Sequence, residues 1–274
     1  AATDIAFAMG VLGLLGTRVP ASLRLFLLTV AIVDDIGAVL VIAFFYTPTV
    51  KTVWLLASVI VFGAMMVLNR MQVGRYTPYI LLALVLWYCV LNTGVHATIA
   101  GVVAALTIPM YSKTGKRMVE HLEHGLAPWS AYLVVPVFGF ANAGVSFAGL
   151  GADEILAPLP IAIAAGLVLG KQVGIFSTIW LAVKFGIAER PENANWVEIW
   201  GVSILTGIGF TMSLFIGGLA FPGNELFIEE AKIGILSGSA ISAIMGYVIL
   251  RLTTTHPEER DLLINPEGEE RDPA

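Results

Sequence analysis

Charged residues are scarce in this sequence, and their scarcity limits what kind of protein it can be. Only 13% of the 274 residues are charged, whereas 57% are hydrophobic. An ordinary soluble domain carries about 25% charged residues, because its surface faces water. The composition therefore predicts a polytopic helical membrane protein that lies in a lipid bilayer. The formal net charge is -5 and no basic arm is present, so we expect no nucleic-acid partner.

Two further features are rare or missing. Cys89 is the single cysteine, which excludes a disulfide within the chain. The opening residues AATDIAFAMG contain no initiator Met, no basic segment and no cleavage-site pattern, so they predict neither a signal peptide nor a natural start. We expect the chain to be N-terminally truncated, beginning inside a helix, with further spans before Ala1.

Long apolar runs are abundant. After an opening segment that ends near Leu15, they lie near residues 23–46, 53–69, 76–91, 94–110, 126–150, 159–183, 198–222 and 228–250. About 20 apolar residues cross a bilayer as a helix. The runs near 76–91 and 94–110 are short for this, so they predict either two short helices or one interrupted crossing.

The basic residues of the connections favour two crossings. If both short runs cross, nearly all Lys and Arg fall on one side, and the other side receives only Lys51 and Lys232. Such an imbalance indicates a cytoplasmic C-terminus. We expect a membrane domain over residues 1–253 and a disordered cytoplasmic tail over 254–274, where Pro, Glu, Asp and Arg replace the apolar pattern.

Two adjacent carboxylates, Asp34 and Asp35, stand in the middle of the run LRLFLLTVAIVDDIGAVLVIAFFY. Each costs roughly 2.5 to 3.5 kcal/mol at mid-span, so the pair indicates a functional site facing a protein interior or a water-filled cavity. Carboxylate oxygens bind protons or a small hard cation such as Na+. Competition of H+ and Na+ for the same oxygens is the chemistry of antiport. A pair that only fixes helix packing is the alternative.

Lys171 is the only basic residue at the middle of the run 159–183. A buried ammonium needs a counter-ion, and Asp34 or Asp35 is the natural candidate. Gly166, Gly170 and Gly174 recur every four residues, which predicts one helix face that allows close approach of a neighbour. A lysine that reaches toward the membrane interface is the alternative.

A weak internal repeat relates the segments Thr3–Gly13 and Thr206–Ile216, TDIAFAMGVLG and TGIGFTMSLFI. Both are interrupted by glycine, and paired broken helices indicate an ion site in a transporter. We expect the helix ends to meet inside the membrane, where Asp4 offsets their positive N-terminal ends and backbone carbonyls help to bind an ion. The residues assigned to this crossing are Thr3, Asp4, Thr206, Gly207 and Gly209. A chance likeness of the two segments, with Gly207 and Gly209 serving only in packing, is the alternative.

The connection KTGKRMVEHLEH mixes basic residues with acids and histidines at the mouth of a helix. Histidine changes charge between about pH 5 and 8, so the cluster is a candidate pH sensor. Solvated charges at a helix end have the same composition. The candidate residues are Glu120, His121, Glu123 and His124.

The segments TDIAFAMG, AIVDDIGAVLVIAFFY, VLGKQVGIF and LTGIGFTMSLFIGGLAF closely resemble the NhaA-type Na+/H+ antiporters of bacteria. The likeness runs from Thr3 to about Arg251. It implies an all-α fold with inverted repeats and two crossing broken helices, one of them only partly present. It also implies a multi-pass transporter of the inner membrane, and a homodimer in the full-length protein.

The resemblance also implies roles for residues. Electrogenic exchange would export Na+ or Li+ and import a larger number of protons, with no cofactor and no enzymatic reaction. Asp35 would be the principal cation ligand and proton carrier, with Asp34 beside it paired to Lys171 until a cation binds. Glu123 and His124 match the pH-responsive region of that family.

Other classes fit the residues less well. The G-x-G-D pattern of intramembrane aspartyl proteases is absent, and the D-D-x-x-D pattern of membrane prenyltransferases fails at Ala38. A passive channel remains open, although Lys171 in the core favours gated exchange. A Na+-coupled symporter of related fold is the leading alternative, distinguished by its need for an organic substrate.

Overall fold

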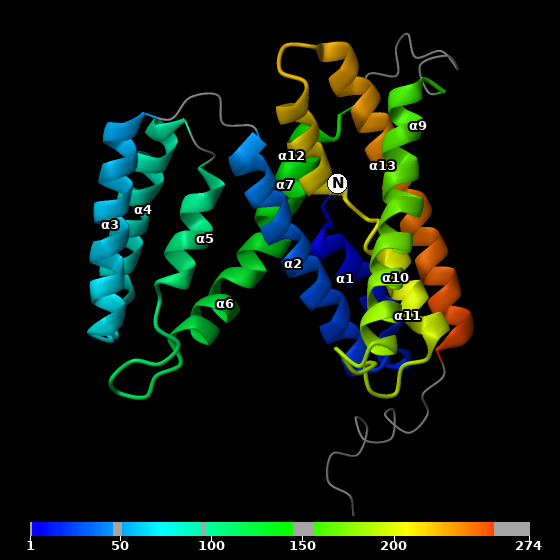
Figure 1. The fold of residues 1–274 in the computed structure, drawn as a ribbon, viewed down its shortest axis with the longest axis horizontal. Helices are drawn as coiled ribbons and strands as arrows, with labels where there is room; N and C mark the ends of the chain where they lie inside the picture. Colours follow the sequence, from blue (N-terminus) through cyan, green and yellow to red (C-terminus); the bar gives the residue numbers. More distant parts are fainter. Residues whose placement is uncertain (1, 46–50, 95–96, 145–155, 255–274) are drawn as a thin grey trace, which may run out of the picture. The chain divides into compact units, whose positions relative to one another are not determined.

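The computed structural model describes residues 2–45, 51–94, 97–144 and 156–254 (Figure 1). Across these ranges the regular elements are helical, and the one β feature is an isolated bridge between Tyr111 and Arg117. The elements are α1 (Ile5–Gly13), η1 (Gly16–Arg18), α2 (Ala21–Phe45), α3 (Thr52–Arg70), α4 (Tyr76–Thr93), α5 (Thr98–Leu106), α6 (Met118–Trp129), η2 (Ser130–Val134), α7 (Val135–Asn142), α9 (Pro158–Ala165), η3 (Gly166–Gly170), α10 (Lys171–Lys184), α11 (Trp196–Leu205), α12 (Phe210–Ala220) and α13 (Glu225–Thr253).

The chain is an all-α polytopic membrane protein, as its composition predicted. Of the described helices, five are long and apolar enough to span a membrane, or up to six when the bent pair α11 and α12 counts as one span. Those five are residues 21–42, 52–70, 76–93, 158–184 and 225–253, which confirms five of the predicted apolar runs. The pair α11 and α12 bends by 47°, as expected for a broken helix.

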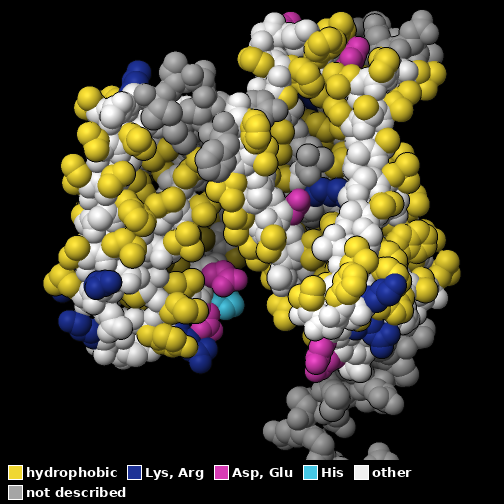
Figure 2. All heavy atoms as spheres, viewed as in Figure 1, with side chains coloured by type: hydrophobic (Ala, Val, Ile, Leu, Met, Phe, Trp, Pro, Cys, Tyr) yellow, Lys and Arg dark blue, Asp and Glu magenta, His cyan; other side chains and the backbone are white. Residues whose placement is uncertain are grey.

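The chain divides into two compact units. Unit 1 comprises residues 1–35 and 138–274, and unit 2 comprises residues 36–137. The tail predicted over 254–274 lies outside the described residues except for Thr254, which is buried and caps the end of α13. Hydrophobic side chains cover much of the visible surface of each unit in Figure 2, as a surface facing lipid tails requires.

In unit 2, the two short apolar runs form separate helices that run in opposite directions. The Lys51 N–H donates to the Thr93 carbonyl at 2.9 Å, so α3 begins beside the end of α4. The Asn69 amide donates to the Thr107 carbonyl at 2.8 Å, so the chain after α5 returns to the end of α3. An interrupted single crossing is therefore excluded. α5 itself is short, with only nine residues.

Basic connections gather at the same end within each unit. In unit 2, the Lys116 ammonium lies 5.0 Å from the centroid of the Tyr76 ring. In unit 1, the Ser22 hydroxyl donates to the Glu192 carbonyl at 2.6 Å, which joins the start of α2 to the connection before α11. Arg18 and Arg251 line one pocket. These contacts match the grouping that the charge distribution predicted within each unit.

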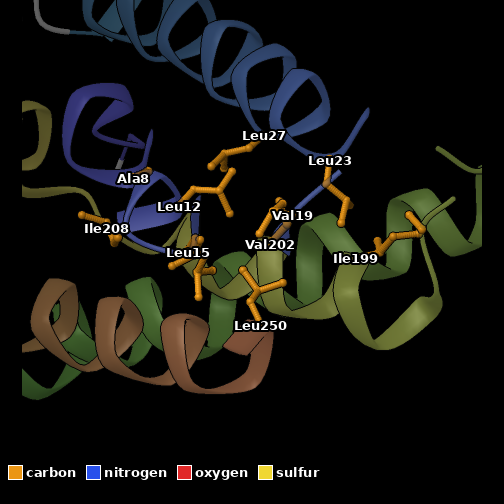
Figure 3. Packing of buried hydrophobic residues seen from close by; sticks show 12 residues of the cluster. Ala8, Leu12, Leu15, Val19, Leu23, Leu27, Ile199, Val202, Ile208 and Leu250 are labelled. Atoms are coloured by element: carbon orange, nitrogen blue, oxygen red, sulfur yellow. The ribbon is translucent and has the colours of Figure 1, made fainter. Parts of the chain in front are cut away.

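The largest buried cluster of unit 1 holds α1 against its neighbours (Figure 3). Its labelled side chains come from α1, α2, α11 and α13 and the loops between them. Leu12, Leu23 and Leu27 are completely buried. Burying a leucine side chain contributes roughly 1.5 to 3 kcal/mol in water; within a bilayer, close packing of this kind supplies the association energy instead. The cluster fixes the position of the chain segment just before α1.

The glycine face predicted for residues 166–174 is wrong. A Cβ atom added at Gly166, Gly170 or Gly174 meets nothing within 4 Å. Close approach occurs on α13 instead, where a Cβ at Gly234 would lie 2.6 Å from the Pro160 carbonyl oxygen. The glycines that allow close packing thus belong to α13. Either of two facing helices can supply the small residues of a close contact, and the sequence did not show which one does.

Candidate ion site

The two broken segments meet in unit 1, as the repeat predicted. The chain before α1 is extended, and the Asp4 N–H donates to the Ile208 carbonyl at 2.6 Å in the break between α11 and α12. The Thr3 hydroxyl donates to the Thr206 carbonyl at 2.9 Å. Thr3 and Asp4 are buried. The crossing therefore brings two unwound backbones together inside the protein.

Residues that correspond in the internal repeat touch one another. Thr3 matches Thr206, and they share the hydrogen bond just described. Phe7 matches Phe210, and their rings meet edge to face with centroids 5.0 Å apart. Contacts between equivalent positions are what a local two-fold relation produces. The likeness of the two segments thus has a structural counterpart at these two pairs of positions.

Asp4 caps two helices with one carboxylate. Its Oδ1 accepts from the Phe7 N–H at 3.1 Å, in the first turn of α1. Its Oδ2 accepts from the Thr211 N–H at 2.9 Å and from the Thr211 hydroxyl at 2.6 Å, in the first turn of α12. A carboxylate at a helix N-terminus satisfies free N–H groups and offsets the helix dipole. The predicted position of Asp4 at positive helix ends agrees with this geometry.

We expect Asp4→Asn to destabilise the protein by about 2 kcal/mol. Asparagine keeps one acceptor oxygen, so one helix start faces an NH2 group and loses its cap. Thr211→Val is the graded comparison, because it removes only the hydroxyl contact and should cost about 1 kcal/mol. Thermal unfolding of the purified protein in detergent measures both. Equal stability of Asp4→Asn and the wild type would contradict the double cap.

Lys171 pairs with Asp34 rather than with Asp35. Its ammonium forms an ion pair with Asp34 Oδ2 and also donates to the Thr3 hydroxyl at 2.7 Å. The Thr3 N–H donates to the same Asp34 oxygen at 2.6 Å. The Lys171 side chain is only 10% exposed and that of Asp34 30%. An ion pair in such surroundings is stable only when both charges remain partnered.

Asp35 differs from its neighbour in lacking such partners. Its Oδ1 is buried and has no hydrogen-bond partner among the described residues. Successive residues of a helix point about 100° apart, which explains why one carboxylate meets Lys171 and the other does not. A buried carboxylate oxygen without a donor is costly unless it binds a proton or a cation. Asp35 is therefore the carboxylate with free capacity for an ion.

Glycine is required in the break because the surrounding atoms leave no room for a side chain. A Cβ at Gly207 would lie 2.5 Å from the Leu167 carbonyl oxygen, and one at Gly209 would lie 2.7 Å from the Ala2 carbonyl oxygen. The Gly209 N–H is satisfied by the Ser239 hydroxyl of α13 at 3.2 Å. The unwound segment is thus held from both sides.

Gly209→Ala is expected to lower stability by about 1 to 3 kcal/mol, because overpacking forces the backbones of the crossing apart. Gly218→Ala in the same α12 is the matched control, since a Cβ there meets nothing within 4 Å. Thermal unfolding of the two variants gives the comparison. The crowding inferred at the break is contradicted if both substitutions have the same effect.

The four candidate pH-sensing residues lie in unit 2, on α6. Glu120, His121, Glu123 and His124 are all exposed. Arg117 forms an ion pair with Glu120 at 3.0 Å, and this hydrogen-bonded carboxylate raises the pKa of Arg117. His121 stacks on Tyr76 with centroids 6.0 Å apart. These contacts are those of a solvated helix start, and they leave the sensor role a hypothesis.

Sequence reasoning missed several polar residues of unit 1. Thr211 was found only by the structure, although a hydroxyl residue just after a glycine break is a common helix start. Asn195 and Glu198 form a reciprocal capping box at the start of α11, and the pattern N-x-x-E was visible in the sequence. Ser239 gave no signal, because nothing local places α13 beside the break.

Comparison with known proteins identifies the family of this chain. The family model of Na+/H+ antiporter 1 matches residues 1–250. The chain belongs to the Na+/H+ antiporter 1 family. Among relatives of this antiporter family, Na(+)/H(+) antiporter NhaA 1 of Erythrobacter litoralis is 74% identical over 260 residues, which cover 95% of this chain and 64% of that protein.

Two other members of the antiporter family show similar coverage. Na(+)/H(+) antiporter NhaA of Rhizorhabdus wittichii is 60% identical over 252 residues, 92% of this chain and 66% of the relative. Na(+)/H(+) antiporter NhaA 1 of Novosphingobium aromaticivorans is 56% identical over 256 residues, 92% of this chain and 60% of the relative. The chain thus spans somewhat less than two thirds of the length of these antiporters. The predicted resemblance to the NhaA type is confirmed.

Proposed function

We propose that the protein exchanges Na+ or Li+ for protons across a bacterial inner membrane. Family membership supports exchange of Na+ and H+ in general. The observation that carries the site assignment is the inequality of the two aspartates: Asp34 is engaged by Lys171 and Thr3, whereas Asp35 has a buried oxygen without a hydrogen-bond partner among the described residues.

In this mechanism Asp35 binds the ion first. A proton or a Na+ on its free oxygen compensates the same buried charge, so the two ions exclude each other. Asp34 then joins as a second oxygen ligand. Na+ competes with the Lys171 ammonium for Asp34, and the lysine moves to the Thr3 hydroxyl, which already accepts from it at 2.7 Å. No cofactor is needed for this cycle, and no bond of a substrate is broken.

Access to the site alternates between the two sides of the membrane. Protons enter from the periplasm and occupy the carboxylates; cytoplasmic Na+ displaces them after the helices shift. The unwound crossing lies where the ends of the broken helices meet, and the hydrogen bond from the Asp4 N–H to the Ile208 carbonyl joins its two segments, so the two segments shift together. That more protons than Na+ cross in each cycle, so that exchange is electrogenic, rests on the resemblance to the NhaA-type antiporters.

We further propose a cytoplasmic C-terminus, a disordered tail after the membrane domain, and a homodimer. The first rests on the positive-inside rule, supported by the contacts that gather basic connections at one end within each unit. The second rests on composition, and the third on the resemblance. The residues Glu120, His121, Glu123 and His124 are proposed as the pH-responsive cluster.

The test of the proposed function is the collapse of a respiration-driven pH gradient in everted membrane vesicles from cells that make the protein. Na+ and Li+ should collapse the gradient, and K+ should not. Vesicles from cells without the protein provide the baseline. A collapse that requires an organic solute in addition to Na+ would favour the symporter, and no response at alkaline pH would reject the exchanger.

The pH dependence follows from competition at one site. As the pH rises from about 6.5 to 8.5, fewer protons occupy the carboxylates, so we expect the apparent KM for Na+ to fall by up to tenfold per pH unit. The rate at limiting Na+ should rise with it. Initial rates in the vesicle assay at several Na+ concentrations measure this. A KM that does not change with pH would contradict competition.

A further inference from the structure

A small pocket opens at the basic end of unit 1, away from the aspartates. It has a volume of about 190 Å³ and is lined by Leu14, Leu15, Arg18, Tyr247 and Arg251. The first three come from the segment that follows α1, and the other two from the last two turns of α13. Two arginines that lie far apart in the sequence therefore border one space.

Neither arginine is neutralised within the described residues. Arg18 and Arg251 form no ion pair with a described carboxylate, since the ion pairs in those ranges are Arg117 with Glu120 and Lys171 with Asp34. Among the described residues, Arg251 donates to the Tyr247 hydroxyl at 3.2 Å, and its guanidinium lies 5.9 Å from the centroid of that ring. The helix dipole stabilises a positive charge at the C-terminal end of a helix. This effect explains the position of each arginine taken alone. It does not account for their convergence on one pocket.

A third arginine adds to the positive charge of this end. The Arg24 guanidinium donates to the Gly16 carbonyl, two residues before Arg18. This bond fixes the turn that carries Arg18. Arg18 thus borders the pocket on one side, and the Tyr247 hydroxyl and the Arg251 guanidinium of α13 border it on the other.

The pocket lies where a phospholipid headgroup would meet the protein. α13 is one of the helices long and apolar enough to span the membrane, and Arg251 lies in its last turn. Residues one and two turns before Arg251 lie on the same helix face. On that face Ile244 and Val248 are exposed by 64% and 45%. An exposed apolar strip therefore leads along α13 to the basic pocket, and Leu14, 75% exposed, borders its mouth.

We propose that this pocket binds the phosphate of an anionic phospholipid, with an acyl chain lying along the exposed face of α13. Guanidinium groups bind phosphate through paired N–H donors, and the Tyr247 hydroxyl supplies a further polar contact. Basic pockets between membrane helices on the cytoplasmic side bind such headgroups. The apolar strip favours a lipid over free phosphate, because free phosphate has no apolar part to place there. This site is independent of the proposed ion exchange.

Native mass spectrometry of the purified protein in detergent tests the proposal. We expect retention of phosphatidylglycerol in preference to phosphatidylcholine. Arg18→Gln with Arg251→Gln should weaken phosphatidylglycerol binding by roughly tenfold or more. The matched control is Lys184→Gln with Arg190→Gln, which removes the same charge from the same end of unit 1 outside the pocket; it should change binding by less than twofold. Thermal unfolding and gel filtration verify that both double variants are folded.

Three results would overturn the proposal. Unchanged phosphatidylglycerol binding in the Arg18 and Arg251 double variant would remove the pocket as the lipid site. Displacement of the lipid by millimolar inorganic phosphate alone would make free phosphate the ligand. Binding that arises only after removal of residues 255–274 would make the acidic tail the occupant of the pocket in the intact protein.

Discussion

Asp35→Asn abolishes Na+-induced collapse of the pH gradient in everted vesicles, if Asp35 is the principal ion ligand. An asparagine side chain is nearly the same size but carries no charge, so it neither releases a proton nor compensates Na+. A unit charge about 4 Å away is worth about 4 kcal/mol at an effective dielectric constant of 20. We therefore expect Na+ affinity to fall by at least about 100-fold, and transport to become undetectable.

Two comparisons separate loss of the ligand from loss of the fold. Asp35→Glu restores a carboxylate at the same position and should recover measurable exchange. Glu225→Gln removes an exposed carboxylate from the first turn of α13 and should leave exchange unchanged. Asp34 and Lys171 remain paired in the Asp35→Asn variant, so its thermal stability should be close to that of the wild type. Full exchange by Asp35→Asn would show that another group binds the ion.

The second large effect concerns the pair of Lys171 and Asp34. Removing one partner of a buried ion pair leaves the other charge without compensation, which costs about 3 to 5 kcal/mol. Lys171→Gln and Asp34→Asn are each expected to destabilise the protein, whereas the double variant should cost less than the sum of the two. The Thr3 N–H donates to Asp34, so part of the Asp34 interaction survives in Lys171→Gln.

Thermal unfolding of the wild type, both single variants and the double variant gives the coupling free energy. Lys184→Gln serves as the control, because Lys184 is an exposed lysine at the end of the same helical stretch and has no carboxylate partner among the described residues. Its ammonium lies 4.6 Å from the centroid of the Trp180 ring, so its loss should change stability by no more than about 1 kcal/mol. Strictly additive effects of the Lys171 and Asp34 substitutions would contradict a coupled pair.

The sequence located the main parts of the candidate site because the physical signals there are strong. A mid-membrane carboxylate or ammonium costs several kcal/mol, so Asp34, Asp35 and Lys171 had to be associated with an interior site. The broken segments were predicted from glycines and a weak repeat, and the structure confirmed their contact through Thr3 and Thr206. These signals are local in the chain.

The sequence alone did not show which side chains of neighbouring helices touch, because that depends on how each helix is rotated about its own axis. The residues alone left Asp34 and Asp35 as equal candidates for Lys171, the resemblance implied Asp34, and the orientation of α2 in the structure gives the pair with Asp34. The same lack of information made the glycine face at Gly166 and Gly170 a wrong prediction, because the close contacts lie on α13. The π-helical turn of residues 166–170 before Lys171 likewise had no sequence signal that we identified.

The most direct test of the central claim is proton release on Na+ binding. The purified protein is placed in weakly buffered detergent solution at mildly alkaline pH, Na+ is added, and the released protons are measured with a pH indicator. We expect the wild type to release protons with Na+ and Li+ but not with K+, and Asp35→Asn to release none. Na+ binding to the wild type without proton release would contradict a site that the two ions share.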